Sequence, residues 1–257
     1  MRFTRLAPGT APPGANRNAA LRLANARTVV FTDDDCRPPS KWLERVLAAV
    51  RGHPGAIIQG PVDGDPDERS KRFSPYPRTQ YIPDVPRPWA ECANIVYPQE
   101  LIERIGGFDE AVQTGEDADL CARARAAGAS FVGDAGMLTF HAVEEGHVRD
   151  WVRDAWRWGD LALLVKRHPE LRAGFPLRVF WRPSHGWMLA ALVALGVAPR
   201  KPVWCLLAAR WALEHRFTAG IHGRLRRLAG LPGWAVIDLA EIVALARGSV
   251  RHGAILL

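Results

Sequence analysis

A short apolar run that stops at three consecutive aspartates constrains this fold most. The run Thr28–Thr32, TVVFT, is rich in β-branched residues and is predicted to form a buried strand. Asp33, Asp34 and Asp35 follow it directly. Three adjacent carboxylates repel one another, so a cation or a set of backbone N–H groups has to compensate them. The simplest interpretation is a solvated acidic turn, and the more specific one is a ligand site at the strand end.

The segments around this strand alternate between helix and strand patterns. Residues 14–26 and 41–51 carry apolar residues at helical spacing, and residues 56–60 form a second apolar strand pattern. This alternation predicts an α/β fold with a mixed, mostly parallel sheet flanked by helices. Residues 61–90 are rich in Pro, Asp and Arg and are predicted to be a long irregular loop.

The aspartates lie where α/β proteins bind ligands, beyond the carboxyl end of a strand. Alternate residues of an extended segment point to opposite faces, which makes Asp33 and Asp35 the natural pair to converge on one ligand. Two hard carboxylates suit Mg²⁺ or Mn²⁺ held together with substrate phosphates.

Two later motifs have an ordinary interpretation when each is taken alone. The acids of GEDADLCAR, residues 115–123, fit the first turn of a surface helix, where they interact favourably with the helix dipole. His141 ends an apolar segment, where a solitary histidine is more often packed in a core than bound to a metal.

In combination and order, the motifs resemble family 2 glycosyltransferases of the GT-A fold. The order is an acidic strand end DDD-C-x-P, then GGFDE, then G-E-D-x-D-L-x-x-R, then a strand that ends in histidine. The segment GANRNAAL matches the loop and helix that precede the acidic strand in that family. The resemblance covers roughly residues 12–160 and implies a GT-A-like sheet.

The resemblance also implies roles for individual residues. Asp35 is expected to be the chief metal ligand, with Asp33 toward the nucleotide-sugar and His141 completing the shell of a Mn²⁺ or Mg²⁺ ion. Asp117 is expected to be the general base that takes the proton from the acceptor hydroxyl. Asp35 and His141 must then lie close together, although 106 positions separate them.

The expected substrate-binding set is wider. It comprises Arg17, Asn18, Asp33, Asp34, Asn94, Glu116, Arg153 and Arg157. The arginines are candidates for phosphate contacts because a guanidinium binds phosphate oxygens bidentately. For each arginine, a solvated surface charge is the alternative.

The implied function is metal-dependent hexosyl transfer from a nucleotide-sugar donor to a hydroxyl, on a glycan or lipid-linked acceptor of the cell envelope. Family members begin with a strand–helix–strand unit that holds the nucleotide. Only about a dozen residues precede GANRNAAL here, so we expect the chain to lack that N-terminal unit. The alternative is a truncated, non-catalytic remnant or scaffold subunit.

Charge divides the chain into two expected domains, a partial GT-A domain over residues 1–150 and a basic, hydrophobic helical region over residues 151–257. Residues 1–148 hold 17 Lys and Arg against 20 Asp and Glu, a balance of −3, and residues 149–257 hold 17 against 7, a balance of +10. A basic region indicates an anionic partner. Its arginines alternate with apolar runs rather than exposed stacking aromatics, which argues against nucleic acid.

The C-terminal region also contains two apolar segments. Residues 183–199 hold no Asp, Glu, Lys or Arg, but their clean apolar core, Trp187–Ala198, is too short for an ordinary span of about 20 residues. We therefore expect a helical hairpin that lies on or dips into a membrane, with basic flanks toward anionic lipid heads. The expected location is the cytoplasmic face of the cell membrane. The alternative is a cytoplasmic protein whose hairpin packs as soluble core.

Overall fold

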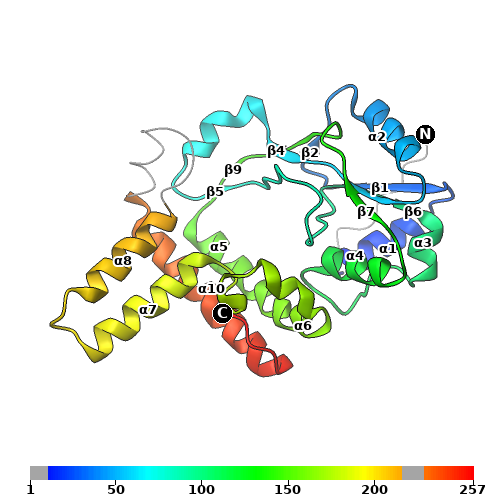
Figure 1. Ribbon diagram of the computed structural model, residues 1–257. Coiled ribbons are helices and arrows are strands. Elements are labelled where there is room, and N and C mark those ends of the chain that lie inside the picture. The colour runs from blue at the N-terminus through cyan, green and yellow to red at the C-terminus, as the bar shows by residue number, and fades with distance from the viewer. Residues whose placement is uncertain (1–10, 216–228) are drawn as a thin grey trace. The chain divides into compact units, whose positions relative to one another are not determined.

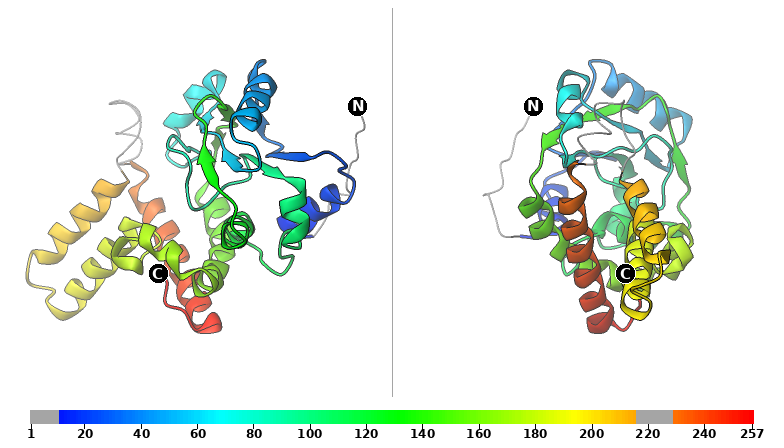
Figure 2. Two further views of the ribbon diagram at one scale, coloured as in Figure 1. Left: turned by 45° about the vertical axis from the view of Figure 1, so that its right-hand side comes forward. Right: turned by 90° about the vertical axis from the view of Figure 1, so that its left-hand side faces the viewer.

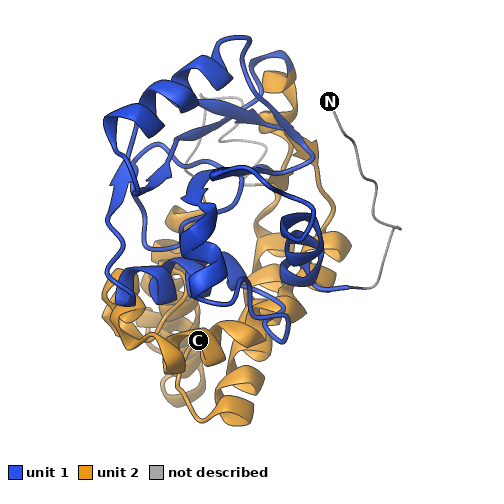
Figure 3. Ribbon diagram, turned by 90° about the vertical axis from the view of Figure 1, so that its right-hand side faces the viewer, with its two compact units in different colours: residues 1–67, 79–142 blue, residues 68–78, 143–257 orange. Residues whose placement is uncertain are grey.

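The computed structural model of the 257-residue chain describes residues 11–215 and 229–257. The chain divides into two compact units, which Figure 3 shows in different colours. The first unit comprises Met1–Asp67 and Thr79–Ala142, and the second comprises Glu68–Arg78 and Val143–Leu257. The second unit therefore takes in a segment from within residues 61–90.

The first unit contains strands and helices in alternation (Figure 1). Its elements are α1 (Pro13–Leu21), β1 (Thr28–Thr32), β2 (Cys36–Arg37), α2 (Trp42–Gly52), β3 (Ile57–Gln59), β4 (Val62–Gly64), β6 (Asn94–Pro98), α3 (Gln99–Arg104), α4 (Glu116–Ala126), β7 (Phe131–Gly133) and β8 (Thr139–His141). The predicted strand at residues 28–32 and the predicted helix after Gly115 are both present.

The main sheet has four strands in the order β1-β6-β3-β7. Strand β6 is antiparallel to both β1 and β3, whereas β3 and β7 are parallel. The mixed sheet is confirmed, but the prediction that its pairings are mostly parallel is wrong. Parallel neighbours need a crossover connection, and the helix–strand alternation in the sequence did not reveal that β6 reverses direction.

Side chains that alternate along β3 and β6 build a core on each face of this sheet. Ile57, Ile95 and Tyr97 pack with residues of α3 and α4. Ile58 and Val96 pack with residues of α2. Because successive side chains of a strand point to opposite faces, α2 covers one face and α3 and α4 cover the other (Figure 1).

A smaller sheet in the same unit has the strand order β2-β8-β4. Strand β2 is antiparallel to β8, and Cys36 is opposite His141 in the register. Strand β4 is parallel to β8. Strand β2 directly follows the three aspartates, and β8 ends at His141. Their pairing in the small sheet therefore brings the aspartates close to this histidine.

The second unit is mainly helical. Its elements are η1 (Pro66–Phe73), which begins in the last residues of the first unit's opening segment, β5 (Pro77–Arg78), β9 (Glu144–Glu145), α5 (Val148–Ala155), η2 (Trp156–Asp160), α6 (Leu161–Arg167), η3 (Pro169–Gly174), η4 (Pro176–Arg178), α7 (Pro183–Val197), α8 (Val203–Glu214) and α10 (Leu231–His252). The prediction of one irregular loop over residues 61–90 is therefore wrong, because that stretch contains β4, η1 and β5.

Helix α10 is the central element of the second unit and contacts α5, η2, α6 and α7. It meets η2 where Gly248 faces Gly159, and a Cβ atom at position 248 would collide with the backbone of Gly159. Helices α7 and α8 pack against each other as the expected hairpin, which both views of Figure 2 show. Within residues 11–215 and 229–257, no helix combines the length and the apolar character that crossing a bilayer requires.

We expect Asn94→Ala to destabilise the first unit strongly. The fully buried Asn94 amide donates to the carbonyl oxygens of Pro61 (3.0 Å) and Met137, and it accepts a hydrogen bond from Trp42 Nε1 (3.1 Å). Alanine leaves all three groups without that partner, at a cost of about 3 kcal/mol in the free energy of unfolding. Urea denaturation measures the loss. Asn25→Ala, at an exposed position, should change the free energy of unfolding by less than about 0.5 kcal/mol. Equal free energies of unfolding for the two variants would contradict the structural role of the Asn94 side chain.

Candidate functional site

Arg17 of α1 connects the two acidic motifs of the first unit. Its Nη1 donates to Glu116 Oε1 at the start of α4, and its Nη2 donates to Asp33 Oδ1 at 3.3 Å. The guanidinium also lies over the ring of Phe108, 5.7 Å from its centroid. A charge-assisted bond to each carboxylate compensates the repulsion that the two acids would otherwise exert on each other.

Gly14, one turn before Arg17, allows this contact. A Cβ atom at Gly14 would lie only 3.2 Å from Phe108 Cβ and 3.7 Å from Glu116 Cβ. Helix α1 therefore packs tightly against Phe108, in the turn before α4, and a Cβ at Gly14 would be in ordinary van der Waals contact with Glu116. This packing brings the Arg17 side chain within reach of Glu116.

The three aspartates form a tight turn rather than an extended strand end. The Cys36 N–H donates to the carbonyl oxygen of Asp33 at 3.1 Å, which reverses the chain between β1 and β2. Asp33 Oδ1 accepts from Arg17, and Asp33 Oδ2 accepts from Gln80 Nε2 at 3.2 Å. The expectation that Asp33 and Asp35 converge on one ligand assumed extended geometry, and it stays a prediction. Asp34 is exposed on the turn.

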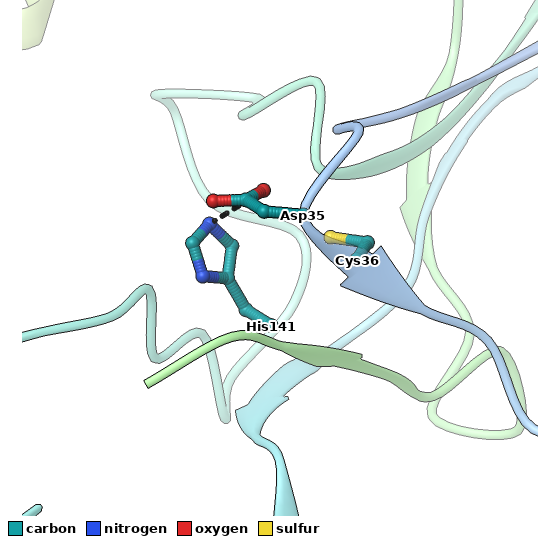
Figure 4. Close-up of side chains that lie close together, drawn as sticks. All are labelled: Asp35, Cys36 and His141. Atoms are coloured by element: carbon teal, nitrogen blue, oxygen red, sulfur yellow. Dashed lines mark ion pairs between the residues drawn. The ribbon is translucent and has the colours of Figure 1, made fainter. Parts of the chain in front are cut away.

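Asp35 and His141 lie side by side, as predicted. The antiparallel pairing of β2 with β8 brings them together, and the Ala142 N–H donates to the carbonyl oxygen of Asp35 at 2.9 Å. His141 Nε2 lies 3.3 Å from Asp35 Oδ1 (Figure 4). The proximity of these two side chains is therefore a consequence of strand register.

The tautomer of His141 indicates what this pair can hold. His141 Nδ1 lies 3.0 Å from the carbonyl oxygen of Ala142, which can only accept, so Nδ1 carries the proton. His141 Nε2 then faces a carboxylate oxygen with a lone pair, unless a second proton or a cation lies between them. An octahedral ion with bonds of about 2.1 Å separates adjacent ligands by about 3.0 Å, close to the observed 3.3 Å. The pair therefore fits a hard divalent cation.

The ionisation of Asp35 depends on whether a cation lies between its carboxylate and His141 Nε2. Burial raises the pKa of the Asp35 carboxyl, Asp33 adds to that effect, and His141 opposes it. A bound cation would favour the ionised carboxylate instead. The neighbouring His141 N–H···O=C bond is the kind of contact that orients a metal-binding imidazole.

Cys36 is a third potential ligand beside this pair, and sequence reasoning gave it no role. Its Sγ atom and the ligand atoms of Asp35 and His141 lie within 4.8 Å of one another. Burial raises the pKa of the Cys36 thiol to about 11, and the thiol donates to the carbonyl oxygen of Ala93 at 3.6 Å. Cys36 therefore remains protonated and packs as a small apolar residue. Among the described residues, Asp33 is not part of this ligand cluster.

Asp117 follows Glu116 in the first turn of α4. Its Oδ1 accepts from the Ala118 N–H at 2.9 Å, and Gly115 before the helix adopts a left-handed conformation with φ of 82°. Burial, then repulsion from Glu116, raises the pKa of Asp117 to about 8, although Arg17 opposes the shift. Asp117 is thus a carboxylate whose basicity is matched to neutral pH.

Two predicted substrate-binding residues have structural partners instead. The Asn18 amide donates to the carbonyl oxygen of Phe108 and accepts from the Phe108 N–H, both at 2.9 Å. Asn94 is buried with the three partners described above. Both side chains hold backbone in place, which leaves little hydrogen-bonding capacity for a substrate.

The remaining two predicted residues belong to the second unit. Arg153 of α5 is exposed and lies near Asp150 (3.7 Å) and Asp154 (3.2 Å). Arg157 of η2 is exposed. Contact of either residue with a phosphate stays a prediction.

Sequence reasoning missed two features of this site. Gln80, in the predicted loop, holds one oxygen of Asp33, and only its polar character in a long loop pointed to it. Arg123 donates to Asp119 Oδ2 at 2.7 Å within α4. It also donates to the carbonyl oxygens of Ile105 and Gly107, so it connects α4 to the glycine-containing turn that follows α3. The i,i+4 spacing of Asp119 and Arg123 was a visible signal for that pair.

Comparison with known proteins assigns the chain to a family. Residues 9–106 match the family model described as Glycosyl transferase family 2. A pre-mycofactocin glycosyltransferase from Mycobacterium tuberculosis is 30% identical over 204 residues, which is 72% of this chain and 41% of that protein. The chain belongs to glycosyltransferase family 2.

Other members of the family match over shorter stretches. Glycosyltransferase AglE from Haloferax volcanii is 28% identical over 122 residues, 45% of this chain and 40% of that protein. This family 2 chain therefore spans about two fifths of the length of the curated relatives it matches.

Solved structures give a weaker likeness. A mannosyltransferase from Pyrobaculum calidifontis, in complex with GDP-Man and Mn²⁺, aligns with 94% of this chain and 67% of its own, at 18% identity and a TM-score of 0.49. A score below 0.5 does not by itself establish a shared fold, so the family assignment depends on the sequence matches.

We expect Asp117→Asn to gain stability relative to wild type as pH rises. The raised pKa of Asp117 means that the folded state holds a proton that the unfolded state, with a pKa near 3.9, has released. Wild-type stability therefore falls between those two pKa values, and the variant lacks this loss. In the presence of EDTA, urea unfolding at pH 5 and pH 8 should show the difference growing by about 1 kcal/mol or more in favour of the variant.

The control for this measurement is Asp84→Asn, which changes an exposed aspartate of the same unit. Its stability difference from wild type should be the same at both pH values. A parallel pH dependence for Asp117→Asn and wild type would show that the Asp117 carboxylate ionises without cost in the folded protein.

Proposed function

We propose that this chain contains the catalytic site of a metal-dependent glycosyltransferase, which moves a sugar from a nucleotide-sugar donor to a hydroxyl acceptor. One observation carries the proposal. Arg17 ties the aspartate turn, which also carries the Asp35–His141 pair, to the helix start that carries Asp117. A cation ligand pair and a carboxylate of raised pKa therefore belong to one site.

Asp35 and His141 are the residues that would hold Mn²⁺ or Mg²⁺. The bound cation would neutralise negative charge on the leaving nucleoside diphosphate. Asp35 supplies a carboxylate oxygen, and the His141 Nδ1–H bond to the Ala142 carbonyl keeps Nε2 directed at it. By holding that cation, these two residues would orient the donor diphosphate.

Asp117 is the general base in this proposal. Its raised pKa makes its carboxylate a better proton acceptor than an ordinary aspartate. Glu116 cannot take that role equally well, because its carboxylate is buried and bonded to Arg17. Arg17 in turn has both Nη atoms engaged by carboxylates, so we assign it a positioning role rather than the predicted phosphate contact.

The acceptor class is part of the proposal. The name of the mycobacterial relative describes glycosyl transfer to pre-mycofactocin. For this chain we propose transfer of a hexose to a hydroxyl of a glycan or a lipid-linked acceptor of the cell envelope. An assay with several nucleotide-sugar donors would identify the sugar and the nucleotide.

We predict that Asp117→Asn lowers sugar transfer by about 10²–10⁴-fold, the usual loss on removal of a general base. The amide keeps the shape and the hydrogen bond from Ala118 but cannot take the proton. The assay measures nucleoside diphosphate released from UDP-glucose, UDP-GlcNAc and GDP-mannose with Mn²⁺ present. Asp84→Asn should keep wild-type turnover.

Two results would contradict this prediction. Transfer by Asp117→Asn within a factor of a few of wild type would remove Asp117 from the base role. Absence of turnover by the wild-type protein with every donor would favour the alternative of a non-catalytic remnant or scaffold subunit.

We further propose that the α7–α8 hairpin binds an anionic membrane surface at the cytoplasmic face of the membrane. The hairpin exposes the aliphatic side chains of Leu192, Val193, Val197, Val203 and Leu206. Arg200 and Lys201 lie in the turn between the two helices. Apolar side chains beside basic ones are the composition that favours the headgroup region of anionic lipid.

We predict that the protein sediments with vesicles of phosphatidylcholine and phosphatidylglycerol and that salt releases part of it. Val193→Glu with Leu206→Glu should abolish sedimentation, because a charge in the apolar face opposes burial in lipid. Arg200→Gln with Lys201→Gln should remove the salt-sensitive part. Val250→Glu, at a still more exposed aliphatic residue of α10, is the control. Equal sedimentation of all variants, or none by wild type, would contradict the proposal.

A further inference from the structure

The second unit contains a buried cluster of two carboxylates and two imidazoles that the proposed function does not use. Asp238 and Glu241 lie on one face of α10 because they are three positions apart. His185 comes from α7, and His215 directly follows α8. The exposed fractions are 1% for Asp238, 0% for Glu241, 0% for His185 and 9% for His215.

Each imidazole faces one carboxylate. His185 Nε2 lies 3.1 Å from Glu241 Oε2, and His215 Nε2 lies 2.9 Å from Asp238 Oδ2. The ligand atoms of His185, Asp238 and Glu241 all lie within 4.8 Å of one another. Among the described residues, this cluster of ligand atoms does not include His215.

The charges of the cluster do not balance without a further positive charge. Arg182 Nη2 donates to Glu241 Oε1 at 3.1 Å, and Arg182 Nε lies 2.8 Å from Oε2 as an ion pair, so Arg182 neutralises Glu241. Asp238 accepts from Trp211 Nε1 at 2.8 Å, a neutral donor. A buried charge of this kind needs either a proton on an imidazole or a cation.

His185 supplies an independent observation. Its Nδ1 is buried and has no hydrogen-bond partner among the described residues. When Nε2 donates to Glu241, the lone pair of Nδ1 is left unsatisfied, at a cost of about 1–3 kcal/mol, and that lone pair is available to a cation. Such a cost is expected where a side chain has a task other than packing.

We propose that His185, Asp238 and Glu241 form a buried site for a divalent cation, and that the cation is Zn²⁺. One imidazole and two carboxylates are ligands that zinc accepts in tetrahedral geometry, with the fourth position left to a further ligand. Trp211 and Arg182 act as the hydrogen-bonding shell that orients the two carboxylates. The site is structural, because it joins the base of the α7–α8 hairpin to α10.

The test uses the full chain with Asp35→Asn and His141→Gln, so that the first unit's ligand pair cannot bind metal. The protein is stripped with EDTA, loaded with Zn²⁺, desalted and analysed by mass spectrometry for metal. We expect about one zinc per chain. Adding His185→Gln should weaken zinc affinity by about 10–100-fold, whereas His168→Gln, elsewhere in the same unit, should not change it.

A second measurement covers the case in which His185→Gln fails to fold. The chain with only Asp35→Asn and His141→Gln is heated with Zn²⁺ or with EDTA, and its melting temperature should be higher with zinc because zinc binds the folded state. No retained zinc, or equal affinity with and without His185, overturns the proposal. An unchanged melting temperature also overturns it and leaves a proton shared by the imidazoles as the compensating charge.

Discussion

The guanidinium of Arg17 is the interaction on which the candidate site depends. It bonds Asp33 after β1 and Glu116 at the start of α4, two carboxylates from motifs more than 80 positions apart. Without a shared cation, acids from these two motifs repel each other at short range. The close packing of α1 on Phe108, at Gly14, brings Arg17 to this position. The helix that precedes the acidic strand therefore assembles the site rather than merely flanking it.

The small sheet β2-β8-β4 positions the second half of the site, the Asp35–His141 pair. Pairing of β2 with β8 fixes His141 beside Asp35, and the tight turn at Asp33 separates the two outer aspartates into different tasks. Asp33 is held by Arg17 and Gln80, whereas Asp35 is left to face His141. Backbone register and one turn thus give three adjacent acids different surroundings: one is bonded to Arg17, one is exposed, and one faces His141.

Local patterns in the sequence predicted most of the helices and strands of the first unit. The order of the motifs predicted that Asp35 and His141 lie close together. They did not identify long-range geometry. The direction of β6 depends on how residues 60–93 connect it to β3, which no local periodicity encodes. The turn at Asp33 depends on one backbone hydrogen bond, and the roles of Asn18 and Asn94 depend on partners in distant segments. His185 interrupted an apolar run and gave no sign of Glu241, 56 positions later, because only helix packing brings them together.

Anomalous X-ray diffraction from crystals soaked with Mn²⁺ and UDP, then with Mn²⁺ and GDP, tests the central claim most directly. The claim is that Asp35 and His141 hold a divalent cation beside the Arg17-linked acids. The account predicts a manganese peak within about 2.3 Å of Asp35 and His141 Nε2, with a diphosphate oxygen as a further ligand. Manganese bound only elsewhere, or Asp35 and His141 still in direct contact with a diphosphate bound nearby, would contradict it.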